Sequence, residues 1–283
     1  MKVDAARLEQ LRQLLVKESQ ASEIKTTSEY EAFRIAFTDG LVIAYKTGKI
    51  VVNGESCRDL LAKVLERMGL EETRYDFIIG SDEAGKGEWL GPMVVAAVAL
   101  TSKQSGVLRS LGVMDSKALS PKKIGELKEQ ILGNAAAVKT VLVSPKTFNE
   151  RIEELHDEGK SLNDLLAWAH AKVIGEIHSQ LKRDHAGMRF EVVIDEFSKL
   201  KTQERLSRVL ALKEVDVIQR PRAEDEMAVA AASVIARRVR DEWIDRTSKQ
   251  LGIELLSLTP NDAVRRADRR RLAKIGYLEK LVS

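Results

Sequence analysis

Between residues 77 and 249, short apolar segments alternate with amphipathic ones, and this alternation constrains the fold more than any other feature. The apolar segments have the length of buried strands, whereas the amphipathic ones carry apolar residues at helical spacing. Predicted strands cover residues 75–84, 93–100, 136–144, 190–197 and 216–220, and predicted helices cover 120–132, 145–155, 161–183 and 224–249. Strands that alternate with helices indicate an α/β domain with helices packed on a sheet.

The first 72 residues have a different pattern. Residues 4–18 and 56–70 read as amphipathic helices, and the β-rich segments between them are broken by a turn signal at Asp39-Gly40. A small α+β unit is therefore predicted for residues 1–72, joined by the linker "EETRYD" to a second domain that spans 77–283. A chain of 283 residues is long enough for two such domains.

Composition excludes several classes of protein. The chain is 44% hydrophobic and 31% charged, which favours a packed core over disorder. A single cysteine, Cys57, excludes an internal disulfide framework and a cysteine-rich zinc site. The charged N-terminus lacks a signal-peptide pattern, and the longest apolar stretch, "LGPMVVAAVAL", is too short to span a bilayer. We therefore expect a soluble, cytoplasmic protein.

Charge does not by itself indicate a nucleic-acid partner. The net charge is only +3, and residues 1–75 hold 12 Lys or Arg against 12 Asp or Glu. Residues 260–283 are more basic, with 7 Lys or Arg against 3 acids. A polyanion would therefore have to bind a local patch, because no global field attracts it.

The stretch "FIIGSDEAGKGEWLGP" (77–92) allows two interpretations. From Gly80 to Lys86 it matches the phosphate-binding pattern G-x-x-x-x-G-K, but Gly87 stands where that pattern needs Ser or Thr. A phosphate loop also leads into a helix, whereas Gly91-Pro92 and a second strand follow here. The alternative is a metal site in which Asp82 and Glu83 end a buried strand and bind a hard cation such as Mg²⁺.

Further acids occupy comparable positions. Asp195 follows the apolar strand residues "VVI", as a site residue or as a cap, and Glu224, Asp225 and Glu226 open the long helix. Acids at a helix start are favoured by the helix dipole alone, so each of the three has a structural explanation as well.

Five blocks resemble one known family. "GSDEAGKGEWLGPMVVAAV", "MDSKALSPKKI", "NDLLAWAHAKVI", "VVIDEF" and "AEDEMAVAAASVIAR" occur in this order between residues 77 and 240 and are similar to the signature blocks of the type 2 ribonucleases H. The "AGKG" form and the extra N-terminal unit favour the ribonuclease HIII branch. This resemblance implies a ribonuclease H-like mixed sheet flanked by helices, preceded by a small domain similar to half of the TATA-box-binding protein that binds the substrate.

The resemblance also implies the site. The catalytic and metal-binding acids fall on Asp82, Glu83, Asp195 and Glu224, with Asp225 and Glu226 as alternatives for the fourth, and the cofactor is Mg²⁺ or Mn²⁺. The implied partner is an RNA/DNA hybrid, with no membrane and no obligate protein partner. The residues implied to contact it are Gly85, Lys86, Gly87, Ser116, Lys117 and Asn163, whereas the role of the basic segment "RRADRRRLAK" is open.

The physical chemistry is consistent with this resemblance. Two divalent ions activate a water and stabilise the leaving oxygen of a phosphodiester, so no Ser or Cys nucleophile is needed. The RNA strand of the hybrid would be cut to give 5′-phosphate and 3′-hydroxyl ends. Two alternatives are incision at single embedded ribonucleotides, as in ribonuclease HII, and a non-catalytic hybrid-binding protein. The four histidines, at 156, 170, 178 and 185, are interpreted as surface or core residues.

Overall fold

The structure is a computed structural model, and it describes residues 3–18, 21–68, 75–114, 116, 119–195, 204–207, 215–220 and 223–282. Within these ranges the side chains at 55, 59, 62, 63, 66, 67, 220 and 224 lie outside the description. The chain divides into two compact units, Met1–Arg74 and Tyr75–Ser283. In the part of the chain described, no helix combines the length and apolarity needed to cross a bilayer.

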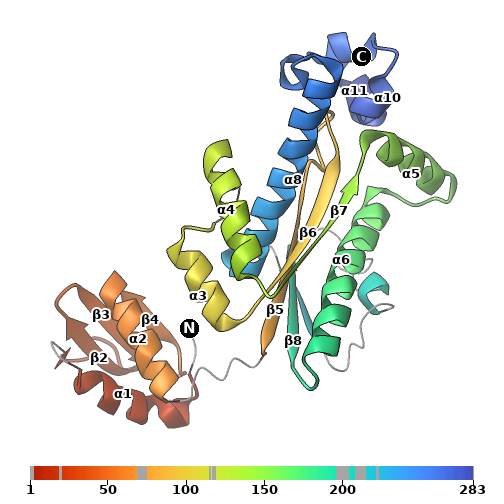
Figure 1. Cartoon of the computed structure of the whole chain (residues 1–283). Helices are drawn as coiled ribbons and strands as arrows, with labels where there is room; N and C mark the ends of the chain where they lie inside the picture. Colours follow the sequence, from red (N-terminus) through yellow and green to blue (C-terminus); the bar gives the residue numbers. More distant parts are fainter. Residues whose placement is uncertain are drawn as a thin grey trace. The chain divides into compact units, whose positions relative to one another are not determined.

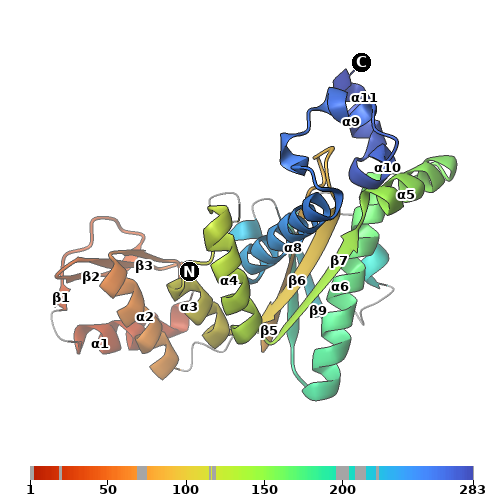
Figure 2. The same ribbon diagram turned by 45° about the horizontal axis from the view of Figure 1, so that its top comes forward.

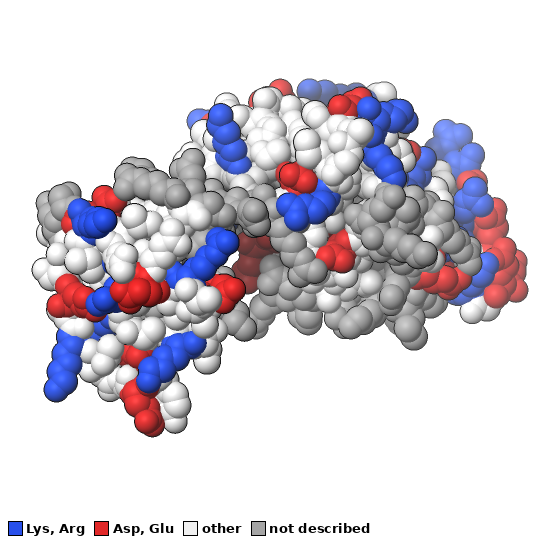
Figure 3. Space-filling view, turned by 90° about the horizontal axis from the view of Figure 1, so that it is seen from below, with Lys and Arg blue, Asp and Glu red and all other residues white. Residues whose placement is uncertain are grey.

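The first unit packs two helices on one face of a small antiparallel sheet. The helices are α1 (Leu8–Val16) and α2 (Glu55–Arg67), and the strands lie in the order β1 (Ser22–Glu23), β2 (Glu31–Phe37), β3 (Gly40–Tyr45) and β4 (Ile50–Asn53). Apolar residues from both helices and from alternate strand positions form its core. Acidic and basic side chains are mixed on the face of this unit seen in Figure 3, which agrees with its balanced charge.

A mixed sheet forms the centre of the second unit. Its described strands are β5 (Phe77–Ala84), β6 (Met93–Leu100), β7 (Ala137–Val143), β8 (Phe190–Asp195) and β9 (Val215–Arg220). They lie in the order β7-β6-β5-β8-β9, in which β6 is antiparallel to both β7 and β5, and β5, β8 and β9 are parallel. The mixed sheet inferred from the family resemblance is therefore confirmed.

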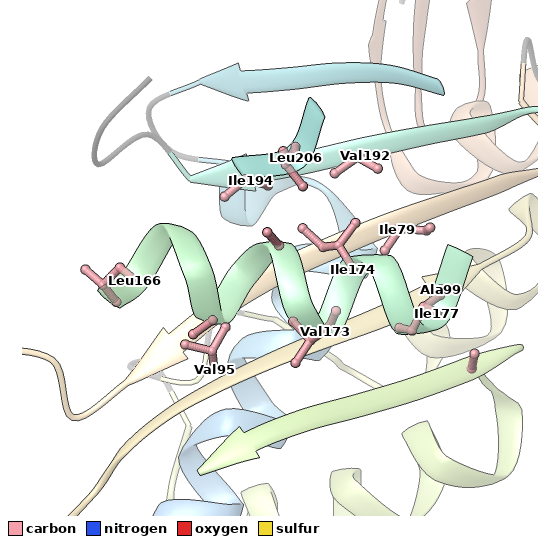
Figure 4. Packing of buried hydrophobic residues seen from close by; sticks show 14 of the residues in the cluster. Ile79, Val95, Ala99, Leu166, Val173, Ile174, Ile177, Val192, Ile194 and Leu206 are labelled. Carbon is pink, nitrogen blue, oxygen red and sulfur yellow. The ribbon is translucent and has the colours of Figure 1, made fainter. Parts of the chain in front are cut away.

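Helices cover both faces of this sheet (Figure 1). On one face lie α5 (Pro145–Asp157) and α6 (Leu162–Asp184), and on the other lie α3 (Ser102–Ser110), α4 (Pro121–Asn134) and α8 (Met227–Leu251). Strand β6 is apolar at every position because its odd-numbered residues face α6 and its even-numbered residues face α8. Figure 4 shows Val173, Ile174 and Ile177 of α6 among side chains of β5, β6 and β8.

Capping residues fix several helix starts. The predicted Ser-Pro start of α4 is confirmed, because the Ser120 hydroxyl accepts a hydrogen bond from the Lys123 amide and Pro121 occupies the first helical position. The Ser161 amide donates to the Asp164 carboxylate at 2.9 Å, which starts α6. The long helix, in contrast, begins later than predicted: residues Ala223–Asp225 form a 3₁₀ turn, and α8 starts at Met227.

Short helices complete the C-terminal part of this unit. They are α9 (Pro260–Val264), α10 (Arg269–Leu272) and α11 (Ile275–Val282), preceded by a 3₁₀ turn at Leu255–Ser257. Figure 2 shows these helices beyond the end of α8, at the end of the sheet where β5 and β6 are joined. The loop at 85–92 that joins these strands carries the "GKG" turn, so the C-terminal segment lies beside it.

Candidate active site

Two acidic residues lie at adjacent ends of parallel strands. The pairing of β5 with β8 runs to Ser81 opposite Ile194, so Asp82 and Asp195 are the next residues on the two strands. Neighbouring strands lie about 4.8 Å apart, which places these two residues side by side at one edge of the sheet. Both strands alternate faces, and on both strands these residues belong to the face that α8 covers.

The 3₁₀ turn at Ala223–Asp225 reaches the same place. Ala223 is fully buried against Val193 of β8 and Val229 of α8. Val193 lies two residues before Asp195 on the same face of β8. Since Glu224 is the residue after Ala223, this contact brings its backbone close to the end of β8 that carries Asp195. The Glu224 side chain lies outside the described residues; Asp225 is exposed and Glu226 caps α8 through its backbone position.

Asp82 is held from the α8 side. Ser233 of α8 favours the ionised form of the Asp82 carboxyl by lowering its pKa, and the Ser233 hydroxyl lies 2.8 Å from that of Ser116. Burial and the neighbouring charge of Glu83 raise the pKa of Asp82 to about 6. The site therefore resists a second negative charge unless a cation compensates for it.

Glu83 projects from the opposite face of β5. Its side chain is 15% exposed, and its carboxylate lies 3.3 Å from Nε2 of His170 and 3.2 Å from Nζ of Lys86. Burial opposes ionisation of Glu83, but the hydrogen bond from His170 and the positive charges of His170 and Lys86 outweigh it and lower the pKa to about 2. The two neighbouring carboxyl groups thus have opposite pKa shifts.

His170 is the residue near the site that the sequence interpretation did not single out. Its ring is fully buried in α6, and Nδ1 lies 2.8 Å from the hydroxyl of Ser81, which also donates to the Ala96 carbonyl at 2.8 Å. His170 was interpreted as a surface or core residue, and the structure places it in the core; its contact with Glu83 was not foreseen. A polar residue on the apolar face of a helix is the signal that could have pointed to it.

The "GKG" turn combines one crowded glycine with one open glycine. Gly85 has φ +80°, and an added Cβ would lie 2.3 Å from the Pro92 carbonyl oxygen, so a larger residue is excluded there. Gly87 is exposed, and an added Cβ would meet no atom within 4 Å. The turn therefore needs Gly85 for its own conformation. At Gly87, in contrast, no side chain or neighbouring atom would prevent another molecule from approaching the backbone.

The remaining predicted residues are distributed as follows. Ser116 is buried, with 6% exposure, and pairs with Ser233, whereas Lys117 lies outside the described residues. Asn163 is half-buried in the first turn of α6. It precedes His170 by two helical turns and therefore lies on the same side of the helix, about 10 Å from it along the axis.

The donor set fits a divalent cation. Asp82, Glu83 and Asp195 supply the hard carboxylate oxygens that Mg²⁺ and Mn²⁺ prefer, and the raised pKa of Asp82 identifies a crowded negative charge that a cation would relieve. Among the side chains that the structure describes, no three His, Cys, Asp or Glu groups already form a metal-binding cluster. That search does not include the Glu224 side chain.

Comparison with known proteins gives consistent results. The family model "Ribonuclease HII" matches residues 79–267. The chain is 35% identical over 245 residues to ribonuclease HIII of Protochlamydia amoebophila (strain UWE25), covering 82% of this chain and 76% of that one. It is 31% identical over 260 residues to ribonuclease HIII of Bacillus cereus (strain ATCC 10987 / NRS 248), covering 85% and 78%.

Solved structures show the same fold. A crystal structure of Bst-RNase HIII in complex with Mn²⁺ matches with a TM-score of 0.64 at 22% identity, covering 100% of this chain and 97% of that one. Aquifex aeolicus RNase H3 matches with a TM-score of 0.55 at 23% identity, covering 98% and 99%.

The mixed sheet flanked by helices is thus a ribonuclease H-like fold. The family match and the sequence relatives are more specific: the chain belongs to the type 2 ribonuclease H family, in its ribonuclease HIII branch. It is therefore a metal-dependent endoribonuclease, and enzymes of this family act on RNA/DNA hybrids.

Proposed function

We propose that Asp82, Glu83, Asp195 and Glu224 hold two divalent ions, Mg²⁺ or Mn²⁺, and that the enzyme uses them to cut the RNA strand of RNA/DNA hybrids. One observation carries this proposal: Asp82 and Asp195 lie side by side at the ends of parallel strands, under the turn that contains Glu224. Support also comes from the Mn²⁺ complex of Bst-RNase HIII. The bound ions would lower the pKa of the attacking water and stabilise the leaving 3′ oxygen.

The protein's own groups would keep the acids in the required state. Ser233 orients the Asp82 carboxylate, and Ser116 orients Ser233, so the burial of Ser116 favours a supporting role. His170, whose Nε2 lies 3.3 Å from the Glu83 carboxylate, and Lys86 hold the pKa of that carboxyl at about 2 and so keep it ionised at neutral pH. No Ser or Cys side chain has to act as a nucleophile, because water attacks the phosphodiester.

Substrate contacts would come from the "GKG" turn and from α6. The open surface at Gly87 allows a sugar-phosphate backbone to approach, and Lys86 beside it offers a positive charge to a phosphate. Asn163 lies on the same side of α6 as His170, so it would extend the contact beyond the acids. RNA is distinguished from DNA through its 2′-hydroxyl groups, for which exposed backbone amides of this turn are suitable partners.

The first unit would add a second substrate contact. Helices cover one face of its sheet, and the other face carries the half-buried Arg34, Ile43 and Tyr45. The exposed lysines Lys46 and Lys49 lie in the turn between β3 and β4, beside that sheet. A sheet face of this composition suits a shallow nucleic-acid groove. Because the net charge of the first unit is zero, the contact would depend on these local side chains and not on a global basic field.

A cleavage assay tests the proposal. Labelled RNA/DNA hybrid and a DNA duplex with one ribonucleotide are incubated with the wild type and with Asp82→Asn, Asp195→Asn and the exposed control Asp157→Asn. We expect cleavage of the RNA strand to 5′-phosphate and 3′-hydroxyl ends that EDTA stops. The two site variants should lose orders of magnitude in rate yet still bind hybrid, and Asp157→Asn should behave as wild type. Turnover that persists in EDTA would exclude the metal mechanism.

A further inference from the structure

The C-terminal segment forms part of the loop that carries the "GKG" turn. Leu90 pairs with Ala273 in an antiparallel β-bridge. The Gly91 amide donates to the Leu272 carbonyl at 2.9 Å, and the Lys274 amide donates to the Trp89 carbonyl at 2.8 Å. The conformation of this loop therefore depends on residues about 180 positions later in the chain.

The side chain of Lys274 strengthens this contact. It is fully buried, and Nζ donates to the Glu88 carbonyl at 2.6 Å and to the Gly91 carbonyl at 2.8 Å. It also lies 5.6 Å from the centroid of the Phe148 ring. One amino group thus joins two carbonyls on either side of Trp89 and Leu90 and fixes the path of the loop between them.

Arg240 of α8 supports the same loop from the other side. Its guanidinium is 4% exposed, donates to the Leu90 carbonyl at 3.1 Å and pairs with the Glu88 carboxylate. Its side chain also occupies the space next to Gly85, where an added Cβ would lie 3.0 Å from two of its atoms. The turn is consequently enclosed between two buried basic side chains.

The segment is anchored at its far side by Asn149 of α5. Its amide nitrogen donates to the Ala273 carbonyl at 2.9 Å and to the Arg270 carbonyl at 3.2 Å, and its amide oxygen accepts from the Ile275 amide at 2.8 Å. A side chain that satisfies three backbone groups of one segment fixes that segment in a single register. The chain of contacts runs from α5 through Lys274 to the "GKG" turn.

A lysine is an unusual choice for a buried position. Burying an ammonium group is unfavourable unless it gains hydrogen bonds, and an apolar side chain of similar length would fill the same space without that cost. Packing alone therefore does not account for Lys274. What a methionine could not provide is the pair of hydrogen bonds to the loop carbonyls.

We propose that Lys274 is a positioning residue for substrate binding, which acts by holding residues 88–91 so that the adjoining Gly85-Lys86-Gly87 turn is preformed. This inference rests on the proposed role of that turn as a substrate contact. It gives a function to the basic C-terminal run that the sequence interpretation left open: the lysine that ends this run acts inside the protein. Loss of the two hydrogen bonds should impair hybrid binding more than the chemical step.

The test compares Lys274→Met, Lys86→Ala and the control Lys249→Met, which makes the same replacement at an exposed position. For Lys274→Met we expect KM for the hybrid to rise about tenfold, equivalent to about 1.4 kcal/mol of binding, with kcat changed less than threefold. Amide hydrogen exchange should accelerate in residues 85–91 and stay unchanged in β6. Lys249→Met should match the wild type in both measurements.

The outcomes separate the two proposals. If Lys86→Ala leaves KM unchanged, the turn does not contact the substrate and the proposed function of the turn is wrong. If Lys86→Ala raises KM while Lys274→Met changes neither KM nor exchange at 85–91, the positioning role is wrong. Should Lys274→Met fold poorly, Asn149→Ala interrupts the same chain of contacts one step away, and an unchanged KM in that variant would equally overturn the inference.

Discussion

Replacing Gly80 by alanine should disturb both the core and the site, because β5 and α8 touch backbone to backbone at this residue. A Cβ added at Gly80 would lie 2.2 Å from the Ala228 carbonyl carbon and from the Val229 nitrogen. No side chain can move to relieve this contact, since both atoms belong to the backbone of the helix. The helix itself would have to move away from the strand.

The size of the effect follows from these distances. To lengthen the contact from 2.2 Å to an ordinary 3.4 Å, α8 must retreat by about 1.2 Å. Overpacking of this kind costs about 1–3 kcal/mol. The retreat would also shift the first turn of α8 and the preceding 3₁₀ turn relative to Asp82 and Asp195, and a displacement of about 1 Å at a catalytic site can cost about 10²-fold in rate.

Guanidinium unfolding and the cleavage rate at saturating hybrid measure the two effects. The control is Gly106→Ala in α3, where an added Cβ meets nothing within 4 Å, so the variant should be as active as wild type and more stable by up to about 1 kcal/mol. A Gly80→Ala enzyme that unfolds at the wild-type midpoint and cleaves at the wild-type rate would refute the close packing of α8 on β5.

Three further predictions concern single groups. Below pH 6 a proton occupies Asp82 and competes with the metal, so calorimetry of the metal-free enzyme should show Mn²⁺ affinity falling about tenfold per pH unit; equal affinity at pH 5 and pH 7 would contradict this. Burial lowers the pKa of Lys274 to about 7, so between about pH 7 and pH 10 the unfolded chain binds a proton that the folded chain does not, and stability rises with pH. Relative to Lys274→Met, the wild type should gain about 2 kcal/mol in unfolding free energy from pH 7 to pH 9, and parallel pH profiles would show that the lysine is charged when buried. Gly87→Ala should raise KM without lowering the melting temperature, whereas Gly85→Ala should lower both stability and activity; destabilisation by Gly87→Ala would show that its surroundings are not open.

Local pattern was sufficient to predict most elements of the sheet domain. The apolar run of β6 and the Ser-Pro cap of α4 depend on neighbours in the sequence, and the structure confirms both. Helix α3 was missed because Val107 and Leu108 are its only apolar side chains, so its sequence has no helical apolar spacing. Its start was nevertheless readable, since Thr101 and Gln104 form a reciprocal capping box.

Tertiary contacts could not be predicted in this way. An apolar strand has the same sequence pattern whichever neighbour it pairs with, so the order β7-β6-β5-β8-β9 follows only from the structure. The same holds for His170, whose contact with Glu83 joins residues 87 positions apart. Lys274 is the clearest case. A lysine in a basic run is expected to lie in solvent, and its burial is explained only by the hydrogen bonds that it donates to the carbonyls of the loop at 88–91.

The most direct test of the metal site is an anomalous difference map from crystals soaked in Mn²⁺. Two crystals are compared, each with an RNA/DNA hybrid bound. One contains the Asp195→Asn variant, and the other contains the wild type, grown with Ca²⁺ before the soak. We expect Mn²⁺ peaks in the wild type between the carboxylates of Asp82, Glu83, Asp195 and Glu224, beside the scissile phosphate, and a weakened peak in Asp195→Asn. Peaks that lie elsewhere, or a full-strength site in the variant, would contradict the assignment of these four acids.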